Sequence, residues 1–305
     1  MTRPSAAVFA YHDVGVRCLR ALIAADFDVQ LVVTHADDPG EARWFDSVAG
    51  LARGHDLPYM TPERGDDPVV LQRLRSAPPD FVFSFYYRHL LPDAMIAVAR
   101  RGALNMHGSL LPRYRGRAPV NWAVLHGETE TGATLHYMVA RADAGDIVDQ
   151  MSVPILPDDT AAEVMRKVTV AAEVVLVRSL PALVAGTAPR RPQRIELGQY
   201  FGRRRPEDGR IDWQRPAAEV HNLVRAVAPP FPGAFTDLRG GRVWIHATRP
   251  APGIDVPSTS PGFLERAGRC YARCGDGATL EIRAAADANG PLPAAALTRL
   301  WSGLT

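Results

Sequence analysis

Short apolar runs alternate with longer amphipathic stretches along the first half of the chain. The four earliest runs cover residues 6–10, 29–33, 80–85 and 102–106, and a helix-compatible segment follows each of them. Strands that are apolar almost throughout and separated by helices are typical of a parallel sheet covered on both faces. Residues 131–139 and 146–155 predict two later strands of this sheet. Residues 158–183 predict one long helix, because an acidic first turn and Thr160 mark its start.

The second half of the chain follows a different pattern. A polar, Arg- and Pro-rich stretch predicts a linker over residues 188–205, and residues 217–228 predict one helix. Short strands with Gly and Pro turns follow at residues 233–238, 241–247, 270–274 and 278–284. This pattern favours a small β-rich domain, such as an OB-like barrel. We therefore predict an α/β, Rossmann-like domain with a mostly parallel sheet over residues 1–187 and the β-rich domain over residues 206–305.

Composition narrows the classes of function. The net charge of +2, with 47% hydrophobic and 22% charged residues, is typical of a soluble globular protein and predicts no nucleic-acid partner. The three cysteines, Cys18, Cys270 and Cys274, have no further Cys or His at the spacing of a metal site. We therefore expect reduced thiols, no metal and a cytoplasmic location. We identify no apolar run of membrane-spanning length and no signal peptide, and expect no membrane insertion.

The first predicted turn argues against two cofactor classes. It offers one glycine, Gly15, where a dinucleotide-binding turn carries three spaced glycines. No P-loop pattern stands there either, so oxidoreductase and kinase functions are disfavoured. An open α/β sheet still binds ligands beyond the carboxyl ends of its strands.

Polar residues gather where the predicted strand 102–106 ends. Asn105 and His107 stand two residues apart, so both side chains point to one face and offer an amide donor and a general base. From spacing alone, a turn-capping Asn and a half-exposed His are equally favoured. Asp143, in an Ala/Gly turn, could approach His107 and favour its imidazolium form, with Asp146 as the rival carboxylate. Without a Ser or Cys nucleophile, this set fits direct transfer of an acyl group to an amine.

The motif N-x-H-x-S-L-L-P-x-Y-x-G at residues 105–116, followed by the aspartate turn, resembles the signature of formyltransferases that use 10-formyltetrahydrofolate. The resemblance implies that Asn105, His107 and Asp143 are the catalytic residues. Further stretches resemble the formyltransferase part of bifunctional enzymes that modify UDP-4-amino-4-deoxy-L-arabinose, namely residues 8–15, 83–92, 107–122, 127–136, 141–148, 201–213 and 230–235.

The same resemblance implies a reaction and its partners. The formyl group of 10-formyltetrahydrofolate would pass to the 4-amino group of a nucleotide-linked aminosugar, most closely UDP-4-amino-4-deoxy-L-arabinose, for lipid A modification and polymyxin resistance. The bifunctional enzymes also carry an oxidative decarboxylase domain, which these 305 residues lack, so we expect that activity on a separate chain.

The resemblance also implies binding residues. Backbone around His89, Leu90 and Leu91 would hold the folate ring, while Arg117, which could otherwise be a solvated loop residue, would meet the folate carboxylate. The loop closing over the folate would consist of Val139, Ala140, Arg141, Ala142 and Asp143. Arg204, in a basic stretch that otherwise suits a solvated linker, and Tyr11 are weaker candidates for contacts to the sugar nucleotide.

Other functions remain open at this point. Methionyl-tRNA formyltransferases share the three residues and the folate, although Lys167 is the only lysine and the charge is near neutral, which suits tRNA poorly. Another nucleotide-aminosugar N-formyltransferase, a formyl-folate hydrolase and a non-catalytic binding protein are further alternatives.

Overall fold

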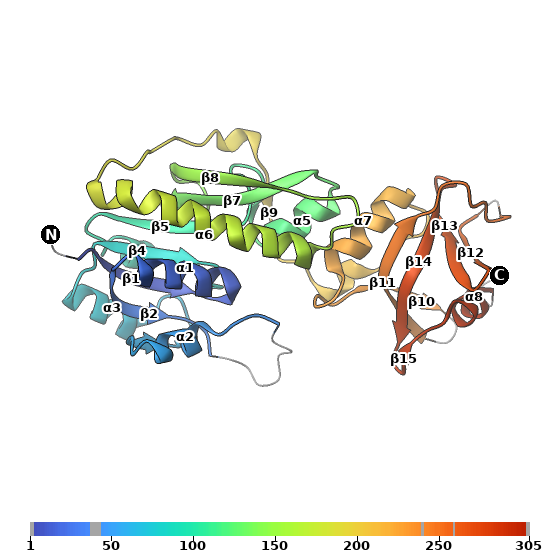
Figure 1. Cartoon of the computed structure of the whole chain (residues 1–305), viewed down its shortest axis with the longest axis horizontal. Coiled ribbons are helices and arrows are strands. Elements are labelled where there is room, and N and C mark those ends of the chain that lie inside the picture. Colours follow the sequence, from blue (N-terminus) through green and yellow to red (C-terminus); the bar gives the residue numbers. More distant parts are fainter. Residues whose placement is uncertain (1–2, 37–43, 239–240, 259, 303–305) are drawn as a thin grey trace. The chain divides into compact units, whose positions relative to one another are not determined.

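The computed structural model describes residues 3–36, 44–238, 241–258 and 260–302. The chain forms two compact units (Figure 1). The first comprises residues 1–119, 131–153 and 166–201, and the second comprises residues 120–130, 154–165 and 202–305. Most of the predicted linker therefore belongs to the first unit. The hydrophobic pattern did not predict that residues 120–130 and 154–165 would join the second.

A seven-stranded sheet forms the centre of the first unit, in the order β3-β2-β1-β4-β5-β7-β8. The strands are β1 (Ser5–Ala10), β2 (Asp28–Val33), β3 (Tyr59–Met60), β4 (Phe81–Phe85), β5 (Gly102–His107), β7 (Glu130–Tyr137) and β8 (Ile147–Pro154). The ladders among β1 to β5 are parallel, whereas β7 runs antiparallel to β5. The predicted α/β class with a mostly parallel sheet is confirmed, and one edge of the sheet is mixed.

Helices cover both faces of this sheet. They are α1 (His12–Ala24), α2 (Val48–Gly54), α3 (Pro68–Ser76), α4 (Asp93–Ile96) and the part of α6 (Ala161–Ala185) that belongs to the first unit. Every residue of β1 is buried, because its alternating side chains meet a helical layer on each side. Phe9 packs with Leu74 of α3 and Met95 of α4. On the other face lie α1 and α6 (Figure 1), and Arg17 of α1 pairs with Glu173 of α6 at 3.0 Å.

A short two-stranded sheet lies outside the main one. β6 (Arg115–Gly116) follows the motif of residues 105–116 and pairs in parallel with β9 (Tyr200–Phe201). A 3-10 turn, η1 (Ile195–Leu197), precedes β9. This pairing ties the predicted linker back to the loop that follows β5.

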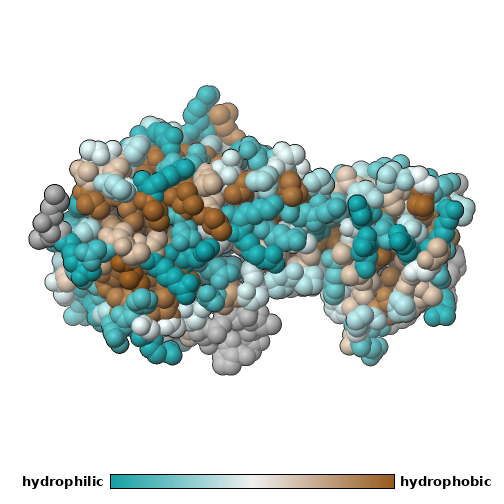
Figure 2. Space-filling view, in the orientation of Figure 1, coloured by the Kyte–Doolittle hydropathy of each residue, from teal (hydrophilic) through white to brown (hydrophobic). Residues whose placement is uncertain are grey.

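The long helix α6 has an unusual composition. It is the one helix of the described residues that is long and apolar enough to cross a membrane, although half of its most apolar window is buried in the fold. The expectation that no run reaches this length and apolarity was therefore wrong. Val170, Val174 and Val177 are exposed on it, and apolar residues interrupt the polar surface in Figure 2. Core helices of soluble proteins share this composition, so it assigns no membrane role.

The second unit is β-rich, as predicted. Its strand order is β10-β11-β14-β13-β12, with β15 paired to β14. The elements are α5 (Pro119–Leu125), η2 (Pro206–Gly209), α7 (Ala217–Val227), β10 (Ala234–Leu238), β11 (Gly241–Pro250), β12 (Gly262–Arg266), β13 (Arg269–Arg273), β14 (Thr279–Asp287), β15 (Gly290–Pro291) and α8 (Ala294–Ser302). The sequence pattern located α7, β10, β11, β13 and β14, but not β12, β15 or α8.

Candidate active site

β5 carries two of the predicted catalytic residues. Asn105 and His107 stand two residues apart on this strand, so their side chains leave the same face of the sheet. On the neighbouring antiparallel strand β7, His136 lies directly opposite Asn105. His107 is the last residue of β5 and only 6% exposed. The strand pairing thus brings an amide and two imidazoles together.

Both ring nitrogens of His107 are engaged. Nε2 lies 2.8 Å from the backbone carbonyl oxygen of Tyr114. Because a carbonyl oxygen can only accept a hydrogen bond, this contact requires a hydrogen on Nε2. Nδ1 lies 3.5 Å from Oδ1 of Asp143. Nδ1 is therefore the ring nitrogen that can gain or lose a proton, and it does so beside a carboxylate.

Asp143 is fixed in a turn after β7. Its Oδ2 accepts a hydrogen bond of 2.9 Å from the backbone N–H of Gly116. The side chain is 13% exposed, and Oδ1 also lies 3.7 Å from Nε2 of His136. The backbone φ of Asp143 is 55°, in the left-handed region that residues other than glycine rarely adopt. This strained turn aims the carboxylate at both imidazoles.

The surroundings keep Asp143 ionised. Burial alone acts to raise the pKa of its carboxyl group. The charge of His107, the ring of His136 and the N–H of Gly116 outweigh that effect and hold the pKa well below its usual range. A carboxylate is therefore present next to His107 at any pH near neutrality.

His136 is a polar residue of this site that the sequence analysis missed. It is 1% exposed, and its Nδ1 lies 2.9 Å from the carbonyl oxygen of Tyr137, which places a hydrogen on Nδ1. Nε2 lies 3.1 Å from Nδ2 of Asn105, so an Nε2 without hydrogen accepts a hydrogen bond from that amide. The available signal was a histidine in the predicted strand of residues 131–139, which follows the predicted strand of Asn105 in the chain.

The structure separates the two rival carboxylates. Asp143 lies within contact of His107, whereas Asp146 continues the hairpin, and its backbone carbonyl accepts a hydrogen bond from the N–H of Tyr137. The predicted pairing of Asp143 with His107 agrees with this geometry. The catalytic roles of these residues stay predictions.

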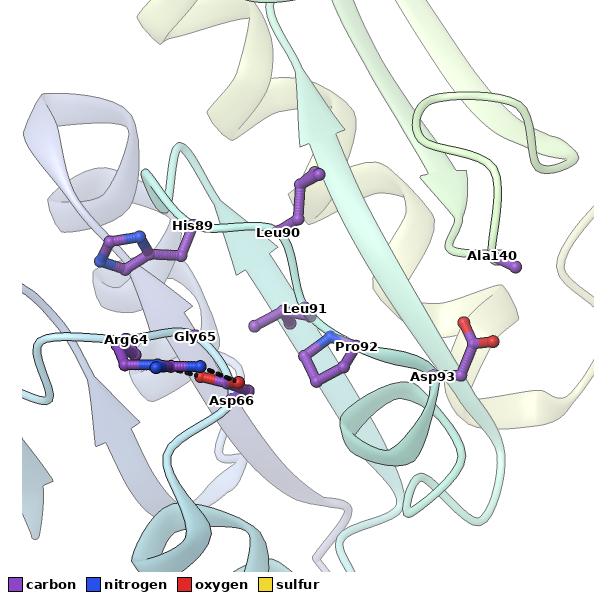
Figure 3. A pocket seen from close by; sticks show the side chains of 9 residues that line it. All are labelled: Arg64, Gly65, Asp66, His89, Leu90, Leu91, Pro92, Asp93 and Ala140. Carbon is purple, nitrogen blue, oxygen red and sulfur yellow. Dashed lines mark hydrogen bonds and ion pairs between the residues drawn. The ribbon is translucent and has the colours of Figure 1, made fainter.

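A cavity of about 510 Å³ opens beside the loop that follows β4 (Figure 3). Its lining includes four residues predicted to bind folate, His89, Leu90, Leu91 and Ala140. The other lining residues are Arg64, Gly65, Asp66, Pro92 and Asp93. The segment with Gly65 packs closely on the loop, since a Cβ there would stand 2.6 Å from the carbonyl oxygen of Leu90. Ala140 precedes Asp143 by three residues, so one loop serves both the cavity and the polar cluster.

Two family models match this chain. One, described as formyl transferase, matches residues 12–180, and the other, described as formyl transferase, C-terminal domain, matches residues 204–298. The first match alone spans more than half of the chain. The chain belongs to the formyl transferase family. It is thus an enzyme that transfers formyl groups.

Solved structures share this fold. An N-formyltransferase from Helicobacter canadensis, in complex with folinic acid and dTDP-3-aminofucose, is 19% identical with a TM-score of 0.70, and the match covers 92% of this chain and 99% of that one. WlaRD, a sugar 3N-formyl transferase solved with dTDP and 5-N-formyl-THF, is 19% identical with a TM-score of 0.72 over 92% and 97% of the two chains. HypX from Aquifex aeolicus, in complex with tetrahydrofolic acid, is 19% identical with a TM-score of 0.65, covering 97% of this chain and 47% of that one.

Four further residues of this formyl transferase that were predicted to bind folate lie outside the lining of the cavity. Val139, Arg141 and Ala142 flank Ala140 in the loop after β7, and Val139 is 46% exposed. Arg117 is exposed, and its Nη2 lies 3.5 Å from the carbonyl oxygen of Arg88. None of these four belongs to the lining of the cavity that the described residues form. Their contacts to folate stay predictions.

The two weaker substrate candidates lie in different units of the formyl transferase. Tyr11, after β1, is buried in an aromatic cluster, with its ring 4.9 Å from His35 and 4.4 Å from the guanidinium of Arg88. Arg204 belongs to the second unit, where its guanidinium lies 4.8 Å from the ring centre of Trp122. Burial lowers the pKa of Arg204. Neither contact tests a role in substrate binding.

The cysteines take no part in this cluster. Cys18, Cys270 and Cys274 are buried free thiols, and burial raises the pKa of each. Within the described part of the chain, His, Cys, Asp and Glu form no group of three or more that could hold a metal.

Proposed function

We propose that this formyl transferase moves the formyl group of 10-formyltetrahydrofolate to the amino group of a nucleotide-linked aminosugar. The observation that carries the proposal is the cluster of Asn105, His107 and Asp143 at the end of β5, joined by the loop of Ala140 to a cavity of about 510 Å³. A neutral amine attacks the formyl carbon, and the electron pair of the carbonyl moves to oxygen. Loss of one amine proton, cleavage of the bond to N10 and protonation of N10 give the formamide and tetrahydrofolate.

His107 manages the proton in this proposal. The carbonyl of Tyr114 holds the hydrogen of Nε2, so Nδ1 takes the proton that the amine loses. The carboxylate of Asp143, 3.5 Å away, stabilises the imidazolium that results. Because Asp143 remains ionised, the pair is ready at neutral pH.

Asn105 stabilises the oxyanion. One hydrogen of its amide nitrogen is directed to Nε2 of His136, which fixes the plane of the amide. The second hydrogen of the same nitrogen is then available to the oxygen on which charge develops. A hydrogen-bond donor that is oriented before the reaction stabilises the transition state more than one that must reorganise. Removal of such a donor typically lowers turnover by about a hundredfold to a thousandfold.

The cavity suits a flat heterocycle on a folate. Its volume of about 510 Å³ lies within the range of roughly 300–1,000 Å³ that is typical of small-molecule sites. Residues 89–91 and Ala140 line it, and we propose that their backbone groups bind the ring while Leu91 packs against its face. The Helicobacter and WlaRD structures, solved with formyl folates and with a dTDP-aminosugar or dTDP, support the choice of both substrates.

For the acceptor, we propose UDP-4-amino-4-deoxy-L-arabinose. The support is the sequence likeness that runs from residue 8 to residue 235. The product would serve lipid A modification and polymyxin resistance, with a cytoplasmic enzyme and an oxidative decarboxylase on another chain. A diphosphate far from the reacting amine lets binding energy orient that amine.

A panel of acceptors tests the proposal. The purified chain is mixed with 10-formyltetrahydrofolate and, separately, with UDP-4-amino-4-deoxy-L-arabinose, dTDP-3-aminofucose, the free aminosugar and methionyl-tRNA. Mass spectrometry then measures the gain of one formyl group. We expect kcat/KM for the UDP-sugar to exceed that for the free sugar at least about a hundredfold, because remote anchoring supplies orientation. A preference for dTDP-3-aminofucose would show that the acceptor is a different nucleotide-linked aminosugar. A preference for methionyl-tRNA would show that the acceptor is not a nucleotide-linked aminosugar at all.

A further inference from the structure

The turn that carries Asp143 stores backbone strain. A non-glycine residue with a φ of 55° persists only when its surroundings hold it there. Gly145 shows how closely this turn is packed, because a Cβ at that position would stand 1.9 Å from the carbonyl oxygen of Tyr137. The orientation of the Asp143 carboxylate therefore depends on groups that hold the turn from outside.

Gln193 supplies such a group. Its Nε2 donates to the carbonyl oxygen of Asp143 at 3.1 Å and to that of Gly145 at 2.6 Å. One amide thus fastens the backbone on both sides of Ala144. Gln193 is partly buried and lies in the segment predicted from the sequence as a linker, between the two family matches that end at residue 180 and begin at residue 204.

The same segment also holds the other side of the carboxylate. We call residues 191–201 the brace. Arg191 exchanges two backbone hydrogen bonds with Ile147, of 2.8 and 3.0 Å, just after the turn. At the far end of the brace, β9 pairs with β6, whose Gly116 donates its N–H to Asp143. The brace is therefore connected to the carboxylate through the turn and through Gly116.

We propose that Gln193 is a positioning residue for the reaction and acts through Asp143. By clamping the strained turn, its amide holds Oδ1 at the distance from His107 that lets the carboxylate stabilise the imidazolium. The expected effect of Gln193 on the rate of formyl transfer rests on the proposed function. The consequence for the two histidines does not, since it concerns only the geometry around Asp143.

Kinetics separate positioning from a merely structural role. Gln193→Met keeps the length of the side chain and removes its donors. Gln199→Met makes the same change at an exposed glutamine of the brace and is the matched control. We expect Gln193→Met to lower kcat by about 10-fold to 100-fold, the effect of a misplaced catalytic group, and to change KM for the formyl donor less than about threefold. Gln199→Met should resemble the wild type in both.

A double-mutant cycle tests whether the effect runs through Asp143. In an Asp143→Asn background, Gln193→Met should change kcat by less than about twofold, because coupled residues are not additive. A loss as large as in the wild-type background would overturn the proposal. If Gln193→Met does not fold, Gln193→Glu, which keeps the size of the side chain and removes its N–H donors, takes its place.

NMR of ¹⁵N-labelled histidines gives a readout that is independent of activity. The ring resonances of His107 and His136 in Gln193→Met should shift toward those of Asp143→Asn, while those of Gln199→Met stay at wild-type values. Unchanged histidine resonances in Gln193→Met would overturn the inference even if turnover fell. Failure of the wild-type chain to formylate any aminosugar would overturn the proposed function alone, since the NMR comparison still stands.

Discussion

The amide nitrogen of Asn105 lies 3.1 Å from Nε2 of His136, directly across the antiparallel pair of β5 and β7. The contact determines which way the amide is turned, because Nδ1 of His136 already donates to the carbonyl of Tyr137. A buried histidine thus sets the orientation of the proposed oxyanion donor.

Replacement of this histidine should affect turnover through Asn105. We expect His136→Phe to lower kcat about tenfold or more, since the amide loses the partner that orients it. His136→Gln, whose side-chain oxygen can accept the same N–H, should retain more activity. Steady-state kinetics with both variants check this. Equal losses in the two variants would show that the acceptor at this position is unimportant.

The proposed catalytic pair itself gives the largest expected effects. Asn105→Ala and His107→Ala should each reduce kcat by about a hundredfold to a thousandfold, the usual effect of one lost donor or base. The dissociation constant for the folate, measured by calorimetry, should stay within about threefold of the wild type. Turnover within about threefold of the wild type in either variant would contradict the assignment.

The ionised state of Asp143 predicts a stability difference with a defined pH range. A carboxyl group whose pKa is lowered on folding stabilises the fold above its unfolded pKa, about 3.9, and this contribution is lost as the pH falls through the folded value. Asp143→Asn should therefore unfold at lower urea concentration than the wild type at pH 5 to 7. The difference in urea midpoint between the two proteins should become smaller below about pH 4. A difference in urea midpoint that stays constant down to pH 3 would argue against an ionised Asp143.

His35 predicts a second pH effect, at higher pH. Burial, together with His89 and Arg88, lowers its pKa to about 4, and its Nε2 accepts the backbone N–H of Arg88 at 3.1 Å. The unfolded chain then binds a proton at His35 between about pH 6.5 and 4 that the folded chain does not, so stability falls as the pH falls through this window. His35→Gln should flatten this dependence in urea unfolding at pH 7.5 and 5. The exposed His55 supplies the control variant His55→Gln, which should keep the wild-type dependence.

The cavity can be tested by filling it. Ala140 lines the cavity from the loop after β7 (Figure 3). Ala140→Trp should raise the KM for the formyl donor by about tenfold or more, because the indole occupies the space of a small-molecule site. The KM for the sugar nucleotide should change little. An unchanged KM for the formyl donor would show that the folate does not bind in this cavity.

The sequence pattern located elements better than it located their partners. The buried strands of the first unit were predictable because both faces of a covered sheet require apolar residues. The spacing of Asn105 and His107 predicted that their side chains share one face of a strand, whereas the choice of these two residues and Asp143 as the catalytic set rested on the resemblance. His136 was missed, because a single histidine in a strand carries no spacing signal until its neighbouring strand is known. Gln193 was assigned to a linker for the same reason, since its two acceptors lie 48 and 50 residues earlier.

The pairing of the brace with residues 115 and 116 has a consequence for synthesis on the ribosome. All three proposed catalytic side chains have been translated by residue 143, yet the strand that pairs with β6 is complete only at residue 201. A nascent chain of 187 residues would contain the whole predicted catalytic domain and still lack Gln193 and β9. The contacts of Gln193 and β9 can therefore form only after residue 201, near the end of the segment between the two family matches, has left the exit tunnel.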